Sequence, residues 1–329
     1  MPNCYLVAGT GVGRAIAYAL LKEDQTGEVT VGDISLERAN KAAKWLIRVL
    51  GRHVEKRCKA VKFDVCQARS QDLESFKAVV SALPVKYNYQ FARLCISAGT
   101  HFCDLGGMVE VTKKMLTLDH LAKHSGISVV PDCGLAPGLA LILARDFIDD
   151  LAPPIDVDIV VGGIPQRPKK PLNYNKVFNL EGLKHICYDL SPTMDDGLIV
   201  LLPPFSQHQK MIVPELARFS DEFRGKTETF VTAGASIAPY TYQKLGVRNL
   251  VERTLRWPGF VKIMKNIREG DFDKVINQYI GPETSIENPD LVFMKVSVSG
   301  GKPKDLKKKE IRLLELFDKE TGLSAMEKT

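Results

Sequence analysis

The sequence contains no long hydrophobic segment. No run of apolar residues approaches the roughly 18 that a membrane-spanning helix requires, and strand-like residues from about Asn3 onward leave no room for a signal peptide. The seven cysteines are scattered, and no two have CxxC spacing, which is typical of buried thiols in a reducing compartment. These absences predict a cytoplasmic protein that does not bind a membrane.

A strong charge bias and histidine clusters are also missing. The chain of 329 residues has 45 basic and 39 acidic ones. They form no basic face with interleaved aromatic residues, which argues against a nucleic-acid partner. Much of the basic excess lies in residues 302–309, which we interpret as part of a solvated hairpin. His120 and His124 share a helical face without a third ligand, so we predict surface residues and no metal site.

Residues 1–150 do contain a regular alternation of short apolar runs and amphipathic segments. The expected strands are residues 3–8, 28–33, 59–65, 78–83, 101–105 and 127–132. The expected helices are residues 13–21, 35–50, 89–98, 110–124 and 138–149. Runs rich in Val, Ile, Leu and Ala are typical of strands covered on both faces. We therefore predict an α/β fold in which this domain is a Rossmann doubly wound parallel sheet.

The pattern changes over residues 151–329. Strand-like runs occur at residues 155–161, 198–202, 228–232 and 291–298, and a helical pattern covers residues 247–269. Prolines cluster between the first two of these runs. We predict an α+β substrate and dimerisation domain built on a mostly antiparallel sheet, and we expect a homo-oligomer.

The first expected strand leads into a glycine-rich turn. The turn Gly9-Thr10-Gly11-Val12-Gly13 opens a helix, and Asp33 ends the next strand 20 residues after Gly13. A dinucleotide site needs a tight turn, a close approach of the pyrophosphate and a helix N-terminus, followed by an acid for the ribose. Counted back from Gly13, the usual GxGxxG spacing places Thr10 where a glycine belongs. Either the loop is one residue tighter, as Gly9-x-Gly11-x-Gly13, or Thr10 weakens the site.

Asp33 also bears on the choice of cofactor. A carboxylate accepts hydrogen bonds from a ribose 2′-hydroxyl and repels a 2′-phosphate, which favours NAD over NADP. We expect Arg38 to face outward on the following helix. Later strand ends are expected to complete the site, with Asp64 and Val65 flanking the adenine, and Ala82, Leu83 and Pro84 lining the crevice near the ribose.

Later motifs make the chain resemble the saccharopine dehydrogenase-related family, and within it the lysine 6-dehydrogenases. The motifs are CDLGG at 103–107, PDCGLAPG at 131–138, VGGIP at 161–165, PLNYN at 171–175, FNLEGL at 178–183 and TLRWPG at 254–259. Their order and spacing cover the chain from residue 1 to residue 329. The resemblance implies a Rossmann domain and an α+β substrate domain, with the active site between them.

The resemblance also implies NAD(P)-linked chemistry at a carbon that bears an amine. In a lysine 6-dehydrogenase the ε-carbon gives hydride to the nicotinamide, and the iminium is hydrolysed to an aldehyde and ammonia. Related members make or break secondary amines such as saccharopine or carboxynorspermidine. We expect an NAD-dependent enzyme that deaminates L-lysine. The alternatives are an NADPH-linked reductase of the saccharopine type and a non-catalytic nucleotide-binding protein.

The chain departs from the family pattern in two further places. Phe260 stands where such sequences often have histidine, so any role of that histidine is lost. The sequence stops at Thr329, where relatives usually continue into a helix that packs on the first domain. We expect a short member of the family or a fragment.

Oxidation of an amine requires its neutral form and therefore a proton acceptor. The candidate catalytic residues are Asp132, at a strand end, and Tyr174. The turn that contains Gly134 and Ala136 opens a helix and is expected beside the nicotinamide. We interpret Tyr174 and Asn175 as part of a polar loop, outside the core, that contacts substrate.

A small polar pocket wall is expected from Thr232 and Ser236. Arg256 is the candidate cation for an amino-acid carboxylate, since guanidinium and carboxylate groups form strong paired hydrogen bonds. The alternative for Arg256 is an ion-paired surface residue.

Overall fold

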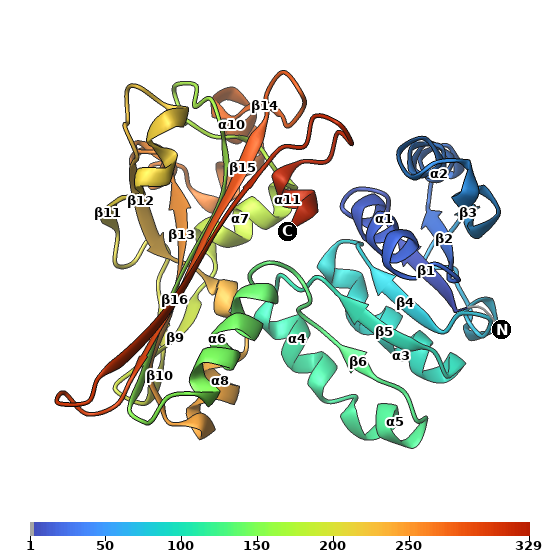
Figure 1. Ribbon diagram of the computed structural model, residues 1–329, viewed down its shortest axis with the longest axis horizontal. Coiled ribbons are helices and arrows are strands. Elements are labelled where there is room, and N and C mark those ends of the chain that lie inside the picture. Colours follow the sequence, from blue (N-terminus) through green and yellow to red (C-terminus); the bar gives the residue numbers. More distant parts are fainter. Residues whose placement is uncertain (1–2) are drawn as a thin grey trace. The chain divides into compact units, whose positions relative to one another are not determined.

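The computed structural model describes residues 3–329. It divides into two compact units, of which the first ends at Gly134 and the second runs from Leu135 to Thr329 (Figure 1). The predicted boundary at residue 150 is therefore too late. The reason is helix α6 (Leu139–Asp149), whose apolar side packs against strands β7 (Ile155–Pro165) and β15 (Asp290–Gly300) of the second unit.

The first unit has a six-stranded parallel sheet in the order β3-β2-β1-β4-β5-β6. The strands are β1 (Cys4–Ala8), β2 (Glu28–Asp33), β3 (Cys58–Lys62), β4 (Ala78–Ser81), β5 (His101–Asp104) and β6 (Val129–Val130). The strand order reverses between β1 and β4, which is the switch point where such sheets bind ligands. The predicted Rossmann fold is thus confirmed, although β6 is much shorter than expected.

Helices follow the strands of the first unit in the chain. They are α1 (Gly13–Glu23), α2 (Leu36–Leu50), α3 (Asn88–Ala98), α4 (Val109–Leu116) and α5 (Asp119–His124). Ser35 caps α2 by accepting a hydrogen bond from the Arg38 backbone N–H. The single helix expected over residues 110–124 is wrong, because the chain breaks into α4 and α5 at Thr117.

Aromatic and aliphatic side chains fill the core of the first unit. Phe91 of α3 and Phe102 of β5 are both buried and meet edge to face, with ring centroids 5.5 Å apart. Leu6 of β1 and Val79 of β4 pack into the same cluster. This packing fixes the ends of the strands, which carry the polar groups described below.

The second unit is built on an eight-stranded mixed sheet. Its main path is β10-β9-β13-β7-β15-β16, and β12 joins β13 and carries β11. The remaining strands are β9 (Ser191–Asp195), β10 (Leu198–Leu202), β11 (Gln209–Ile212), β12 (Lys226–Val231), β13 (Val247–Arg256) and β16 (Lys307–Leu316). A separate small pair consists of β8 (Asn175–Lys176) and β14 (Gly281–Glu283).

Most neighbours in the large sheet are antiparallel, as predicted, but β7 and β13 run parallel at its centre. Alternate residues of β7 point into two different cores, so that Ile159 packs on one face of the sheet and Val160 on the other. The helical pattern expected over residues 247–269 is wrong. Its first part is the central strand β13, and only a short helix, α9 (Phe260–Met264), follows it.

The helices of the second unit cover both faces of this sheet. Besides α6 and α9 they are α7 (Leu180–Tyr188), α8 (Ala238–Tyr242), α10 (Phe272–Tyr279) and α11 (Ala325–Lys328). No helix within residues 3–329 combines the length and apolar character needed to cross a membrane. Strands β15 and β16 form a long hairpin, and its turn lies in the lysine-rich segment 302–309, as predicted (Figure 1).

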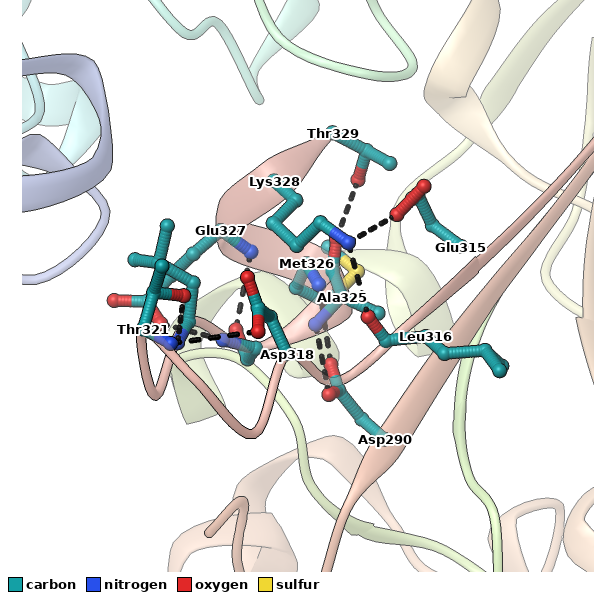
Figure 2. Close-up of polar contacts among 12 residues, drawn as sticks. Asp290, Glu315, Leu316, Asp318, Thr321, Ala325, Met326, Glu327, Lys328 and Thr329 are labelled. Carbon is teal, nitrogen blue, oxygen red and sulfur yellow. Dashed lines mark hydrogen bonds and ion pairs between the residues drawn. The ribbon is translucent and has the colours of Figure 1, made fainter. Parts of the chain in front are cut away.

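The end of the chain is tied to the large sheet by one buried carboxylate. Asp290, at the start of β15, accepts hydrogen bonds from the backbone N–H groups of Ala325 at 2.8 Å and Met326 at 3.1 Å (Figure 2). Ser324 and Glu327 form a capping box at the same helix terminus. These contacts satisfy the free N–H groups of α11 and hold it on β15.

Candidate functional site

The glycine-rich turn between β1 and α1 has the features of a phosphate-binding loop. Gly9 has φ +98°, and a Cβ there would lie 2.7 Å from the Ala82 carbonyl oxygen, so only glycine makes this turn. A Cβ at Gly13 would lie 3.1 Å from the Val7 side chain, which makes Gly13 the close-packing position. A Cβ at Gly11 would meet no described atom within 4 Å. The structure therefore supports the tighter Gly9-x-Gly11-x-Gly13 register.

The N-terminus of α1 provides the donors for an anion. Val12 occupies the N-cap position, and within the described residues no side chain caps the helix and no acid lies in its first turn. The Arg14 and Ala15 backbone N–H groups already donate to the Gly11 and Val12 carbonyl oxygens. The N–H groups of residues 11–13 are therefore the candidate donors, and the helix dipole favours negative charge. The open space at Gly11 and these donors fit a pyrophosphate.

Thr10 points away from the phosphate position, toward the end of β2. Its hydroxyl donates a 2.6 Å hydrogen bond to Asp33 Oδ2. Thr10 therefore holds the acid in place, and the predicted clash between its side chain and a pyrophosphate does not arise in this register.

Asp33 is buried and fully engaged at the end of β2. Its Oδ1 accepts hydrogen bonds from the Ser35 backbone N–H at 2.9 Å and from Arg38 Nε and Nη2 at 2.9 and 2.8 Å. Burial raises the pKa of Asp33, but the hydrogen bonds from Thr10, Ser35 and Arg38 outweigh it and lower the pKa overall. Arg38 is exposed, as predicted, but the first turn of α2 also brings its guanidinium back onto Asp33.

The other predicted cofactor residues lie at neighbouring strand ends. Ala82 follows β4 and contacts the turn at Gly9 and Gly13, and the Leu83 side chain also lies near Gly9. Pro84 comes directly before the short helical turn that begins at Val85. Asp64 follows β3 and accepts a hydrogen bond from the Cys66 backbone N–H at 2.9 Å, and half-buried Val65 lies between them in the chain. Their predicted contacts with a nucleotide stay predictions.

A second acidic site lies at the ends of β5 and β6, and the sequence analysis missed its central residue. Asp104 is 1% exposed and accepts hydrogen bonds at Oδ1 from the N–H groups of Gly106 at 2.6 Å and Asp132 at 3.3 Å. Its Oδ2 is buried without a hydrogen-bond partner among residues 3–329. Burial raises the pKa of Asp104 to about 6.

Asp132 lies next to Asp104 but has a different environment. Its backbone is left-handed, with φ 63°, and its Oδ1 accepts a 2.9 Å hydrogen bond from Thr112. Gly134 is the last residue of the first unit, whereas Ala136 belongs to the second. The predicted catalytic role of Asp132 and the cofactor contacts of Gly134 and Ala136 remain untested predictions.

In the second unit a buried cation lies against aromatic rings. Arg256, at the end of β13, is 2% exposed, and its guanidinium lies 4.6 Å from the centroid of the Tyr174 ring and 5.3 Å from that of Phe260. Its Nη1 donates to the Leu255 carbonyl oxygen at 2.8 Å. Its Nε has no hydrogen-bond partner, and Arg256 has no ion pair, in the part of the chain that the structure describes. Arg256 is therefore not the ion-paired surface residue of the alternative prediction.

Tyr174 and Asn175 are also buried, so the interpretation of this segment as a loop outside the core is wrong. Tyr174 is 1% exposed and belongs to the apolar core, where Phe260 packs edge to face at 5.4 Å. Within residues 3–329 its hydroxyl and the Oδ1 of Asn175 are buried without partners. Burial raises the pKa of Tyr174 well above its usual value, so its hydroxyl stays protonated. The proline-rich sequence concealed this, because prolines signal turns wherever they lie.

Thr232, from the predicted polar pocket wall, contacts a carboxyl group that the sequence analysis did not identify. Glu252 of β13 is buried, and its Oε2 accepts hydrogen bonds from Thr232 Oγ1 at 2.5 Å and the Gly234 backbone N–H at 3.1 Å. Thr254 lies beside Thr232, with their hydroxyl oxygens 3.0 Å apart. Ser236 follows with φ 46°. Burial raises the pKa of Glu252 to about 7, although the hydrogen bonds from Thr232 and Gly234 oppose this shift.

Several other features lie outside these sites. His120 and His124 are exposed on α5, and no group of three or more potential metal ligands occurs in residues 3–329. A cleft of about 580 Å³ in the second unit lies between α9 and α10 and is lined by Lys262, Ile263, Asn266, Ile267, Arg268, Asp271, Val275 and Tyr279. It includes none of the predicted site residues.

Comparison with known proteins agrees with this geometry. Residues 6–130 match the family model of the saccharopine dehydrogenase NADP-binding domain. Those residues include the glycine turn, Asp33 and Asp104, so the first unit is similar to domains that bind a nicotinamide dinucleotide.

Two individual proteins extend the similarity to the whole chain. The mitochondrial alpha-aminoadipic semialdehyde synthase of Mus musculus is 23% identical over 98% of this chain and 34% of its own length, so the chain spans about a third of that relative. The structure of apo saccharopine dehydrogenase (L-Glu forming) from Saccharomyces cerevisiae is 15% identical, with a TM-score of 0.73 over 99% of this chain and 88% of that one. The second match shows a shared fold.

Proposed function

We propose that the chain is a member of a saccharopine dehydrogenase-related family and that it is a nicotinamide-dependent oxidoreductase that acts on a carbon–nitrogen bond of an amino acid. The first unit would bind the dinucleotide at the Gly9–Gly13 turn, where space and helical N–H groups fit a pyrophosphate. When bound, the nicotinamide would accept or return a hydride.

The observation that carries the amino-acid part of the proposal is the surroundings of Arg256. Arg256 has no ion pair within residues 3–329, although its charge acts on Glu252. A buried guanidinium without a close counter-ion costs several kcal/mol, and two aromatic rings offset only about 2 kcal/mol of it. A substrate carboxylate would supply the missing charge and a partner for Nε. The buried Tyr174 hydroxyl and Asn175 Oδ1 are further unpaired polar atoms nearby in this unit and are proposed to contact substrate.

The proton acceptor for the amine is proposed to be Asp104, with Asp132 beside it. Its pKa of about 6 leaves it ionised at neutral pH yet close enough to take a proton, and its Oδ2 has no partner within residues 3–329. Tyr174 stays protonated because burial raises its pKa. It would therefore act as a hydrogen-bond donor to the substrate.

We propose two candidate amine substrates. Oxidative deamination of L-lysine at its ε-carbon follows from the motif resemblance described above. Oxidation of a secondary amine such as saccharopine is the second candidate. It is favoured by the similarity to a saccharopine dehydrogenase and to an alpha-aminoadipic semialdehyde synthase.

For the cofactor we revise the prediction of NAD and propose that the chain also accepts NADP. The negative charge of Asp33 is compensated by Arg38, so it repels a 2′-phosphate less than a bare carboxylate would. The Arg38 side chain is 59% exposed and could turn to the phosphate, since guanidinium binds phosphate with two parallel hydrogen bonds. The matching family model is that of an NADP-binding domain.

The proposal is tested by steady-state oxidation of L-lysine and L-saccharopine with NAD and NADP, followed by the variant Arg256→Met. We expect kcat/KM for the amino acid to fall by at least about 30-fold, because removing one partner of a buried charge pair costs 2–5 kcal/mol. Dinucleotide binding, measured by fluorescence, should not change. Arg256→Lys is the matched control that keeps the charge and loses the planar donors.

The thermal stability of the same variant separates binding from folding. A buried ion without a partner is costly, so Arg256→Met should unfold at the same or a higher temperature than the wild type. Turnover of neither amine with either dinucleotide would refute the proposed activity. A variant that loses stability and activity together would show that Arg256 serves the fold instead of the substrate.

A further inference from the structure

Two cysteines lie side by side at the ends of strands β5 and β6. Cys103 of β5 pairs with Val130 of β6 in the parallel register. Three residues later, the Cys133 backbone N–H donates a 2.7 Å hydrogen bond to the carbonyl oxygen of Asp104. The sheet thus holds the two cysteine backbones at neighbouring strand ends, and a disulfide between them would require a Cα separation of roughly 4.4–6.8 Å.

The side chains of the pair also meet. The Cys133 Sγ–H donates to the Val130 carbonyl oxygen at 3.4 Å and more weakly to that of Pro131 at 3.9 Å, and a hydrogen bond from Cys103 acts on the Cys133 sulfur. Cys133 is exposed, whereas Cys103 is only partly so. Because it accepts that hydrogen bond, Cys133 has a lowered pKa, and the same hydrogen bond together with burial raises the pKa of Cys103. Cys133 is therefore the thiol that ionises first and that a reagent in solution can reach.

The Asp104 carboxyl group adds a proton acceptor beside the pair. Its Oδ2 is buried and has no hydrogen-bond partner in the described residues, and its charge acts on both thiols.

From this arrangement we propose that Cys103 and Cys133 form a redox-active dithiol, which a low-molecular-weight disulfide such as oxidised glutathione converts to an internal disulfide. The Cys133 thiolate attacks one glutathione sulfur, forms a mixed disulfide and releases the first glutathione thiolate. Cys103 loses its proton and attacks the Cys133 sulfur, which releases the second. Two thiols are oxidised, one glutathione disulfide is reduced to two thiols, and dithiothreitol reverses the reaction.

The proposed dithiol adjoins Asp104 and Asp132, which the dehydrogenase proposal also uses, but its test counts thiols and does not depend on that activity. The full chain is equilibrated with mixtures of reduced and oxidised glutathione, quenched with acid, alkylated in denaturant and mapped by mass spectrometry. We expect the number of free thiols to fall from the seven of the sequence to five, with one peptide pair joined through Cys103 and Cys133. Treatment with dithiothreitol should restore all seven.

Single variants distinguish a resolving pair from one reactive thiol. Cys103→Ser should stop at a stable glutathione adduct on Cys133, and Cys133→Ser should form neither the adduct nor the disulfide. Cys66→Ser is the matched control, because Cys66 is exposed on another loop of the same unit and its removal should leave the disulfide unchanged. The proposal is overturned if wild-type protein keeps both thiols at every glutathione ratio, or if it accumulates only the adduct. Circular dichroism of each variant checks that it is folded.

Discussion

Two buried charges of the molecule have opposite surroundings. Asp33, in the first unit, has a partner for each carboxylate oxygen, namely Thr10 for Oδ2 and Ser35 and Arg38 for Oδ1. Arg256, in the second, has no ion pair and an Nε without a partner within residues 3–329. Where the fold itself satisfies a charge, a ligand must compete with existing bonds. Where it does not, a ligand can add the missing partner.

The same contrast extends to the neighbours of these charges. The carboxyl of Asp33 has a lowered pKa because of its hydrogen bonds, although burial raises it. Glu252 lies four residues before Arg256 on the same strand. Burial raises the pKa of its carboxyl group to about 7. The first unit therefore has a stable charged site, whereas the second has a buried acid that changes its protonation state near neutral pH. The variants below either remove the contacts that make the two environments differ or measure how much those contacts contribute.

The largest effect is expected from Gly9→Ala, which breaks the satisfied site. Alanine would carry a Cβ at φ +98°, only 2.7 Å from the Ala82 carbonyl oxygen. Strain and overpacking together should lower the unfolding free energy by about 4 kcal/mol and displace Thr10 from Asp33. Urea denaturation measures this loss.

Gly11→Ala is the matched control for that variant. Its Cβ would meet no atom of the described chain within 4 Å, so stability should be unchanged while dinucleotide affinity falls, because the pyrophosphate is expected there. Equal stability of the two variants would contradict the tighter register.

The next effect concerns Glu252 and has a definite sign with pH. Its pKa is raised from 4.5 to about 7 in the folded chain, so the folded state binds the proton more tightly than the unfolded state. The contribution is fully present below pH 4.5 and is lost as pH rises toward 7, in total on the order of 3 kcal/mol. Glu252→Gln should remove this part of the slope.

Urea denaturation of wild type and variant at a series of pH values measures the difference. Glu320→Gln, at an exposed acid, is the control and should follow the wild type. If the Glu252→Gln curve has the wild-type slope, the carboxyl is either ionised at all these pH values or not buried as described.

These two regions also differ in how well the sequence predicted them. The turn and Asp33 were found because their residue types and spacing are local: a strand, glycines and an acid follow one another within about one βαβ unit. The register of the turn was not decided by spacing. It depends on Ala82, which approaches Gly9 from a different strand.

The sequence analysis placed the charged residues of segment 247–256 on a helix, and there is a physical reason for this error. Arg248, Glu252 and Arg256 follow one another at intervals of four, which is typical of one face of a helix. In the structure they lie on strand β13, where alternate residues Leu250, Glu252 and Thr254 are buried. The sheet neighbours β7 and β12 that bury them are distant in sequence, so no local pattern signals the burial of Arg256 or Glu252.

A smaller effect is expected from Arg38→Gln, which sharpens the contrast by leaving Asp33 without its cation. The bare carboxylate should repel a 2′-phosphate, so we expect NADP affinity to fall about tenfold, equal to about 1.4 kcal/mol, with little change for NAD. Titration of both dinucleotides by calorimetry measures the ratio. Lys41→Gln, which removes an exposed ion pair with Glu37 on the same helix, is the control. A ratio that stays constant would mean that Arg38 serves only to hold Asp33.

An effect of about the same size is expected from Thr10→Val, which keeps the shape of the side chain and removes its hydrogen bond to Asp33. The loss should be about 1–2 kcal/mol in stability, since the bond is to a charged acceptor. Dinucleotide affinity should fall slightly, because Asp33 loses one of the groups that orient it.

Thr10→Gly tests the opposite possibility, that the side chain obstructs the pyrophosphate. If Thr10→Gly raises affinity while Thr10→Val lowers it, the methyl group obstructs the ligand. If both lower affinity, the hydroxyl positions the acid, as its 2.6 Å contact with Asp33 indicates.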